Sequence, residues 1–237
     1  PETAIDLNNL ALVYHSLGDY AKAEPLYLRA LKIEEGFYGP DHEFVGMTLN
    51  RLGLVSHFLG KDMYAESFYK QALAINEKIY GPYHAELAPD ISNLAEVCHA
   101  LQNDVQAEFF FKRALIIAEM NGLSRSLWRI RYGLSRIFAK QGYFDAAIFF
   151  AKHAINILEN SEPDISGMEK ASQRFFITDR EAVYIHLADI LTVQGRISEA
   201  LRAIDMFKKE EYAESSEDAL KDGDASDIPF FNSAEQE

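Results

Sequence analysis

The chain repeats one phrase at an interval of 42 residues. Residues 18–42 read GDYAKAEPLYLRALKIEEGFYGPDH, and residues 60–84 read GKDMYAESFYKQALAINEKIYGPYH. A third copy, QNDVQAEFFFKRALIIAEMNGLSRS, begins at Gln102. A period of this length is typical of proteins built from stacked equivalent units, in which each unit buries its apolar face against its neighbours. The repeat therefore favours an elongated array over a single globular core.

Every unit has small and apolar residues at constant distances from one origin. Glycine stands at four of the five origins and supplies the positive φ that a tight corner between helices needs. The origins are Gly18, Gly60, Gln102, Gly142 and Gly195. Five residues after them stand Ala23, Ala65, Ala107, Ala147 and Ala200, and eight residues before them stand Leu10, Leu52, Leu94, Leu134 and Leu187.

The residues before the first origin have helical periodicity. Apolar side chains at i, i+1, i+3, i+4 and i+7 lie within one face of a helix, and here they are Leu10, Ala11, Val13, Tyr14 and Leu17. Each unit is thus predicted to be an amphipathic helix, a turn and a second helix. The predicted fold class is all-α, a right-handed α-solenoid of helix-turn-helix repeats.

The columns of leucine, a small residue, glycine, alanine, an aromatic residue and alanine resemble the tetratricopeptide repeat over about residues 3–212. The usual unit has about 34 residues, and the longer unit here, ending in YGPDH or YGPYH, resembles the variant of kinesin light chains. Gly39-Pro40 and Gly81-Pro82 are expected to end helices. Likewise His42 and His84 are expected to serve the packing of these turns.

The last predicted unit resembles a second kind of segment. Residues 175–212, FFITDREAVYIHLADILTVQGRISEALRAIDMFKKEEY, resemble the segment that joins bacterial tetratricopeptide arrays to a CHAT domain, a caspase-like cysteine peptidase module. The chain starts within a repeat-like phrase at Pro1 and is interpreted as a fragment. The expected organisation is a solenoid over 1–212, with repeats at about 1–42, 43–84, 85–124, 125–164 and 176–212, and an acidic linker or tail over 213–237.

Charge and composition exclude several classes of protein. The net charge is −14, which argues against nucleic-acid binding because that needs clustered Lys and Arg. Much of the charge lies in the tail, where Glu210 to Glu237 hold ten acidic residues and one lysine. No apolar stretch is long enough to span a membrane. A single cysteine favours a reducing compartment, so a cytoplasmic protein is expected.

The resemblance implies a peptide-binding groove on the concave side of the first helices. At 100° per residue, Asn8, Leu12 and His15 lie opposite the apolar face and are expected to point outward. Asparagine amides can hold an extended main chain whatever its sequence, and Leu12 and Leu54 would add apolar pockets. The expected groove residues are Asn8, Asn9, Leu12, His15, Asn50, Leu54, His57, Ser92, Asn93, Glu96, His99, Tyr132 and Arg136.

Blander interpretations of these residues remain open. Asparagine is also common on a solvated surface, and repeats can share residues by descent alone. Helices of adjacent units stack about 8–10 Å apart, whereas Zn–N bonds are ~2.0–2.1 Å long, so one zinc ion is not expected to gather these histidines and no metal site is expected. The groove lacks the lysines that capture carboxylate groups in this family, and Glu96 and Arg136 are expected to pair.

No catalytic constellation is expected, and no cofactor. Cys98 stands in an apolar column, which favours a buried inert thiol over a nucleophile. The predicted function is a protein–protein interaction scaffold that binds a peptide or partner segment, as the recognition or regulatory arm of a larger bacterial CHAT-type peptidase. The alternatives are a stand-alone adaptor similar to kinesin light chains, or a structural solenoid that self-associates through its truncated N-terminal unit.

Overall fold

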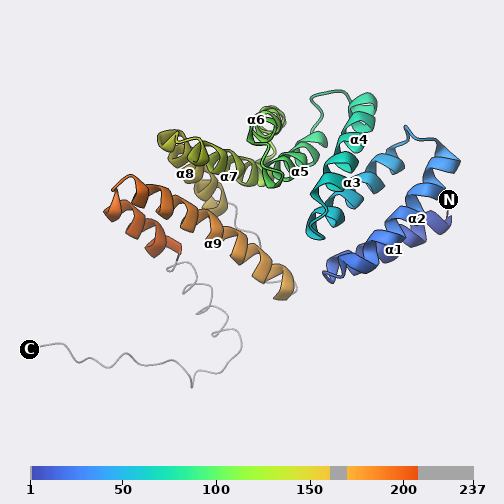
Figure 1. Ribbon diagram of the computed structural model, residues 1–237, viewed down its shortest axis with the longest axis horizontal. Coiled ribbons are helices and arrows are strands. Elements are labelled where there is room, and N and C mark those ends of the chain that lie inside the picture. Colours follow the sequence, from blue (N-terminus) through green and yellow to red (C-terminus); the bar gives the residue numbers. More distant parts are fainter. Residues whose placement is uncertain (1, 161–169, 208–237) are drawn as a thin grey trace, which may run out of the picture. The chain divides into compact units, whose positions relative to one another are not determined.

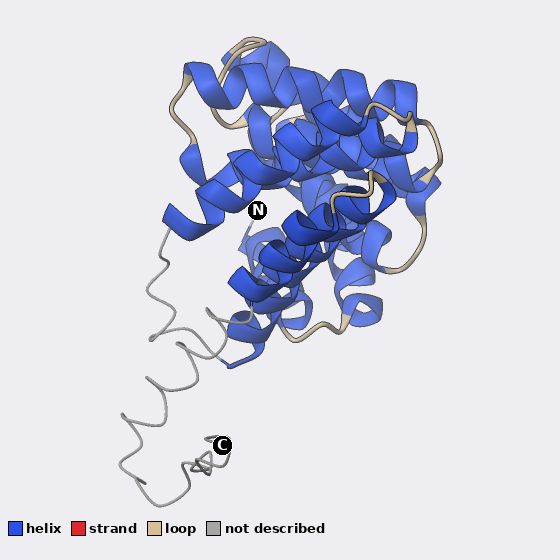
Figure 2. Ribbon diagram, turned by 90° about the vertical axis from the view of Figure 1, so that its left-hand side faces the viewer, coloured by secondary structure: helices blue, strands red, loops and turns tan. Residues whose placement is uncertain are grey.

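The computed structural model describes residues 2–160 and 170–207. The chain divides into two compact units, residues 1–168 and 169–237, so the continuity of the array between them stays a prediction. Every regular element in the described ranges is a helix (Figure 2), which confirms the all-α class. The expected tail at 213–237 lies outside the described residues.

The first unit consists of four helix pairs that follow one another in chain order (Figure 1). Each helix packs against the next one along the chain, and α3, α5 and α7 also contact each other in sequence. The helices are α1 (Glu2–Ser16), α2 (Tyr20–Tyr38), α3 (Glu43–Phe58), α4 (Asp62–Tyr80), α5 (Leu87–Ala100), α6 (Asp104–Met120), α7 (Ser124–Lys140) and α8 (Phe144–Asn160).

The second unit contains one more helix pair among its described residues. Helix α9 spans Lys170–Val193, and a shorter helix covers 197–207. The Tyr184 and Phe207 rings pack with their centroids 5.7 Å apart, which ties the two helices together. This pair corresponds to the predicted repeat at 176–212.

The corners within the pairs have the predicted backbone conformation. Gly18, Gly60, Gly142 and Gly195 all have positive φ, and Gln102, which replaces glycine at the fifth corner, has φ of 61°. At each corner an amide donates back to a carbonyl five residues earlier, as in the Asp19–Tyr14 bond of 2.9 Å, which is the Schellman pattern of helix ends. The prediction of positive φ at these corners is confirmed.

The alanine and leucine columns form the core of the first unit. Ala23, Ala65, Ala107 and Ala147 are fully buried, because a small side chain there lets two helices approach closely. The leucines of the inner pairs are also fully buried, whereas Leu10 on α1 is 46% exposed. The face that α3 and α5 bury is therefore exposed on α1 within the described residues.

The YGPxH turns join one pair to the next. Gly39 has φ of +88° at the end of α2, and the His42 ring stacks on Tyr38 with centroids 4.5 Å apart. His42 Nδ1 accepts a hydrogen bond of 3.2 Å from the Phe44 amide, which caps α3. The His84 ring stacks on Tyr80 in the same way, at 4.9 Å. The predicted packing role of both histidines is confirmed.

Candidate functional site

Asn8 lies inside the joint between the first two helix pairs. Its side chain is 8% exposed, and its Nδ2 donates to Glu34 Oε1 at 2.7 Å and to Thr48 Oγ1 at 3.2 Å. These bonds connect α1 to α2 and α3. The prediction that Asn8 points outward is wrong, because a helix in a stacked array contacts its own partner and the next pair, and this buries a wider arc than the leucine stripe.

The next joint repeats this polar contact 42 residues later. Asn76 Nδ2 donates to Asp90 Oδ2 at 3.0 Å, and the Asn50 side chain lies close enough to Asp90 to lower the pKa of its carboxyl group as well. Burial raises the pKa of Asp90 to about 6, against the lowering effect of the two amides. Ser92 continues the column and is 8% exposed. The column that begins at Asn8 therefore connects units to each other.

Asp90 should make stability depend on pH. Its pKa is raised from 3.8 to about 6 in the folded chain, so folding favours the protonated form, and this stabilisation is lost as the pH rises through about 6. We expect a loss on the order of 2 kcal/mol between about pH 4 and pH 7. Asp90→Asn cannot titrate, so the difference in free energy of unfolding between wild type and variant, from urea titrations, should change with pH by this amount. A constant difference would contradict the prediction.

The next column along the helices faces outward instead. Asn9 is exposed, and Arg51 and Asn93, at the same position in the following units, are half-buried. No hydrogen bond or ion pair of the Arg51 guanidinium is present within the described part of the chain. Leu12 is 42% exposed, and Leu54 is half-buried. These residues form an open surface, which we call the α1–α3–α5 face; Asn9 and Asn93 stand at its polar edge, one residue after the column that begins at Asn8.

The histidine column connects the two helices within a pair. His57 Nδ1 lies 2.6 Å from Asp62 Oδ1, and His99 Nδ1 lies 2.8 Å from Asp104 Oδ1. His15 has Tyr20 at the matching position and packs against its ring, with centroids 5.5 Å apart. Burial and the nearby charge of Arg51 lower the pKa of His15. The histidines thus hold the corners and remain partly accessible at the face.

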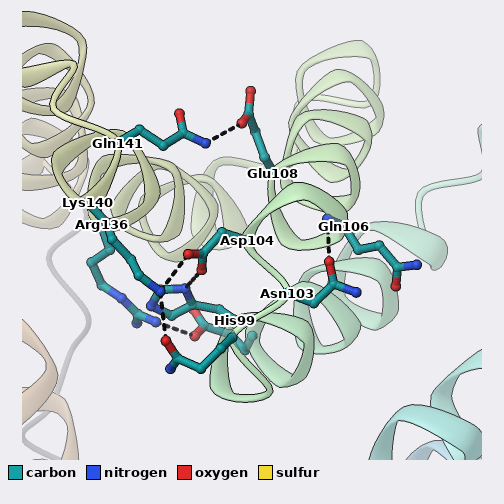
Figure 3. Close-up of polar contacts among 10 residues, drawn as sticks. His99, Asn103, Asp104, Gln106, Glu108, Arg136, Lys140 and Gln141 are labelled. Carbon is teal, nitrogen blue, oxygen red and sulfur yellow. Dashed lines mark hydrogen bonds and ion pairs between the residues drawn. The ribbon is translucent and has the colours of Figure 1, made fainter.

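Four of the predicted groove residues meet in a polar cluster between α5 and α7, which Figure 3 shows in part. Arg136 Nη2 donates to Glu96 Oε2 at 3.0 Å, which confirms the predicted pair, and the Arg136 guanidinium lies 5.2 Å from the Tyr132 ring centroid. Lys140 Nζ lies 2.6 Å from Asp104 Oδ2, the carboxylate that also contacts His99. The cations here are already paired with carboxylates.

The environment of Cys98 disfavours the thiolate form. The Cys98 thiol is fully buried, and burial raises its pKa to about 11, so the thiol stays protonated at neutral pH. Over residues 2–160 and 170–207, no three His, Cys, Asp or Glu side chains lie close enough to hold a metal ion. None of the described helices combines the length and apolar composition needed to cross a membrane.

The repeated residues match a known protein family. The tetratricopeptide repeat model matches residues 2–74 and 48–120. The chain belongs to the tetratricopeptide repeat family. Its architecture of stacked helix pairs, with glycine corners and alanine columns, is that of a repeat scaffold for protein–protein interaction. No curated protein sequence matches this tetratricopeptide repeat protein.

Solved structures share the fold of this tetratricopeptide repeat protein at low sequence identity. BtubC (BKLC) from P. vanneervenii is 21% identical, with a TM-score of 0.72 over 88% of this chain and 80% of that chain. Kinesin light chain TPR-like repeats from Podosopora anserina are 17% identical, with a TM-score of 0.66 over 86% and 92%. The MamA protein is 17% identical, with a TM-score of 0.59 over 91% and 95%. At these identities the likeness concerns the fold alone.

Proposed function

We propose that this tetratricopeptide repeat protein binds an extended segment of a partner protein along the α1–α3–α5 face. The observation that carries the proposal is the row of side chains at Asn9, Arg51 and Asn93, which has donors facing outward beside the apolar Leu12 and Leu54. Amide and guanidinium donors can bind main-chain carbonyls of an extended segment, and apolar side chains give specificity.

The charges favour the N-terminal half of this face. Arg136 and Lys140, towards its C-terminal end, are paired with carboxylates from the preceding unit. Arg51, by contrast, has no such partner among the described residues. A partner segment would have to break ion pairs to bind near α7. Near α1 and α3 it meets the amide of Asn9 and the guanidinium of Arg51, which are available to donate hydrogen bonds. We therefore place the main contacts on α1 and α3.

A pair of leucines allows a matched test of this face. Leu12 on the face is 42% exposed and Leu28 on α2 is 45% exposed, so Leu12→Glu and Leu28→Glu should disturb the fold equally little. We expect Leu12→Glu to lose at least 10-fold of partner recovery in pull-downs from the source organism's lysate, and Leu28→Glu to recover partners as the wild type does. Equal recovery by both variants, with unchanged helicity, would refute binding at this face.

A larger context for the array rests on the last repeat. We propose that the array is the recognition or regulatory arm of a bacterial CHAT-type peptidase, because residues 175–212 resemble the segment before such a module. Sequencing the reading frame past Glu237 tests this proposal. A continuation with a histidine and a cysteine placed as in caspase-like peptidases supports it, and an early stop codon supports a stand-alone adaptor in the cytoplasm.

Self-association is a second candidate, favoured by the open face of α1. Leu10, Val13 and Leu17 are 46%, 54% and 74% exposed, whereas Leu52 and Val55, which take the places of Leu10 and Val13 in the next unit, are fully buried. Exposed apolar surface of this kind promotes association. Light scattering over a 100-fold range of protein concentration decides the matter, since a constant monomer mass excludes self-association through this face.

A further inference from the structure

A pocket of about 140 Å³ opens between α1, α2 and α3. Ile5, Phe44 and Met47 form an apolar wall, each between 41% and 51% exposed, and Asn8, Glu34 and Arg51 supply the polar lining. A cavity of about 150 Å³ holds one benzene molecule. The pocket therefore has room for a single side chain that enters from the surface.

Two polar groups of this pocket, Glu34 Oε2 and the Arg51 guanidinium, have no hydrogen bond among the described residues. Glu34 is 4% exposed; its Oε1 accepts the bond from Asn8, and its Oε2 is buried with no hydrogen bond. Burial raises the pKa of Glu34, and the Thr48 hydroxyl, the Asn8 amide and the nearby charge of Arg51 oppose this rise. A buried carboxylate oxygen without a donor costs free energy, so a ligand that supplies an N–H group to it gains more than one that meets solvated groups.

The next joint of the array shows what such a carboxylate takes. There the Asp90 carboxylate accepts a hydrogen bond of 3.0 Å from the Asn76 carboxamide, and the Asn50 side chain lies beside it. In the first joint, Glu34 itself occupies the position of Asn76, 42 residues earlier. Its carboxylate has the carboxamide of Asn8 and the hydroxyl of Thr48 beside it. The first joint thus has one carboxamide fewer than the second, and the pocket opens beside it.

We propose that this pocket binds the carboxamide of a glutamine or asparagine side chain in the partner segment. The amide N–H donates to Glu34 Oε2, and the amide oxygen accepts from the Arg51 guanidinium. A cationic side chain would meet the charge of Arg51, an anionic one would meet Glu34, and an apolar one would leave both unpaired. This inference names a residue preference for the proposed α1–α3–α5 face and rests on that function.

A main-chain amide has the same hydrogen-bonding groups, but it is flanked by chain on both sides. To reach Glu34 it would have to bring two further residues into a space sized for one side chain. A side-chain carboxamide stands at the end of a flexible side chain and can enter the pocket without neighbouring residues. Blocked amino acids distinguish the two sources, because N-acetyl-alanine N-methylamide carries the main-chain amides without the side-chain one.

The test is a titration of the whole chain with blocked amino acids, followed by NMR of the methionine methyl groups. N-acetyl-glutamine N-methylamide should shift the Met47 methyl with saturation and leave Met63, which is 76% exposed on α4, unchanged. The glutamate, leucine and alanine analogues should bind at least 5-fold more weakly. Equal binding of the alanine analogue, tighter binding of the leucine analogue, or no shift of Met47 with the glutamine analogue would each overturn the proposal.

Variants separate this pocket from the rest of the face. Glu34→Gln replaces the free acceptor by an amide group of the same size and should weaken the glutamine probe at least 5-fold, while Glu35→Gln on the exposed side of α2 should leave it unchanged. Arg51→Gln provides a second variant if Glu34→Gln does not fold. If Met47 does not respond to the glutamine probe while Leu12→Glu still loses partner recovery in the pull-down, the pocket is refuted and the proposed function stands.

Discussion

Leu94→Ala is expected to lower the free energy of unfolding by about 3 kcal/mol. Leu94 is fully buried in α5, within a cluster of buried side chains from α4, α5, α6 and α7. Truncation removes transfer free energy and leaves a cavity that the helices on both sides cannot close. Urea unfolding followed by circular dichroism measures the loss, and hydrogen exchange shows whether it is concentrated in the pairs that contact α5, as expected for a nearest-neighbour array.

The matched control is Leu10→Ala, in the same column of the repeat. Leu10 is 46% exposed on α1, so the same truncation should cost less than about 1 kcal/mol. The two substitutions remove the same atoms from equivalent positions of a helix. A difference between their losses of unfolding free energy therefore reports how deeply each leucine is buried in the array. Equal costs at both positions would show that the face of α1 is covered in solution and would contradict its exposure.

Gly133→Ala should have a comparable effect for the opposite reason. A Cβ atom at residue 133 would clash with Cζ of Phe111, with two more ring carbons within 2.6 Å. Phe111 is fully buried, so neither α6 nor α7 can move aside without disturbing the core. Overpacking of this kind commonly costs 1–3 kcal/mol, and we expect about 3 kcal/mol for three close ring contacts. Thermal unfolding with a concentration-matched wild type checks the loss.

Gly36→Ala is the control for this substitution. Gly36 also lies within a helix, but a Cβ atom there would meet nothing within 4 Å. Alanine should therefore stabilise α2 by about 0.5–1 kcal/mol through helix propensity alone. In the Gly133→Ala background, Phe111→Leu should recover part of the loss by vacating the ring position. A Gly133→Ala protein as stable as the wild type would exclude the close contact.

The corners show how far local sequence reasoning reaches. Positive φ could be predicted at Gly18, Gly60, Gly142 and Gly195 because only glycine adopts it at little cost, and the structure confirms it there. Gln102 adopts the same conformation without that freedom. The 42-residue spacing predicted a corner at Gln102, whereas glutamine as a residue type does not indicate a turn. Periodicity was thus the stronger signal.

The candidate site was less accessible to such reasoning. The outward direction of Asn8 was deduced from the leucines of its own helix, yet Asn8 binds Glu34 and Thr48 on two other helices. The open column begins one residue later, at Asn9 and Arg51. The sequence did contain a usable signal, since Asn8, Glu34 and Thr48 recur as Asn50, Asn76 and Asp90, which are all polar positions at one 42-residue spacing.

Sequence by itself determined the repeat length, the helix pairs, their corners and the alanine columns, because these follow from φ preferences and helical periodicity within about 20 neighbouring residues. Only the tertiary structure decided which polar side chains form hydrogen bonds between units and which remain accessible at the surface. That choice depends on the angle at which α3 meets α1 and α2, and a rotation of one residue, 100°, moves a side chain from the joint to the surface. The pocket beside Glu34 and the unpaired Arg51 follow from that packing.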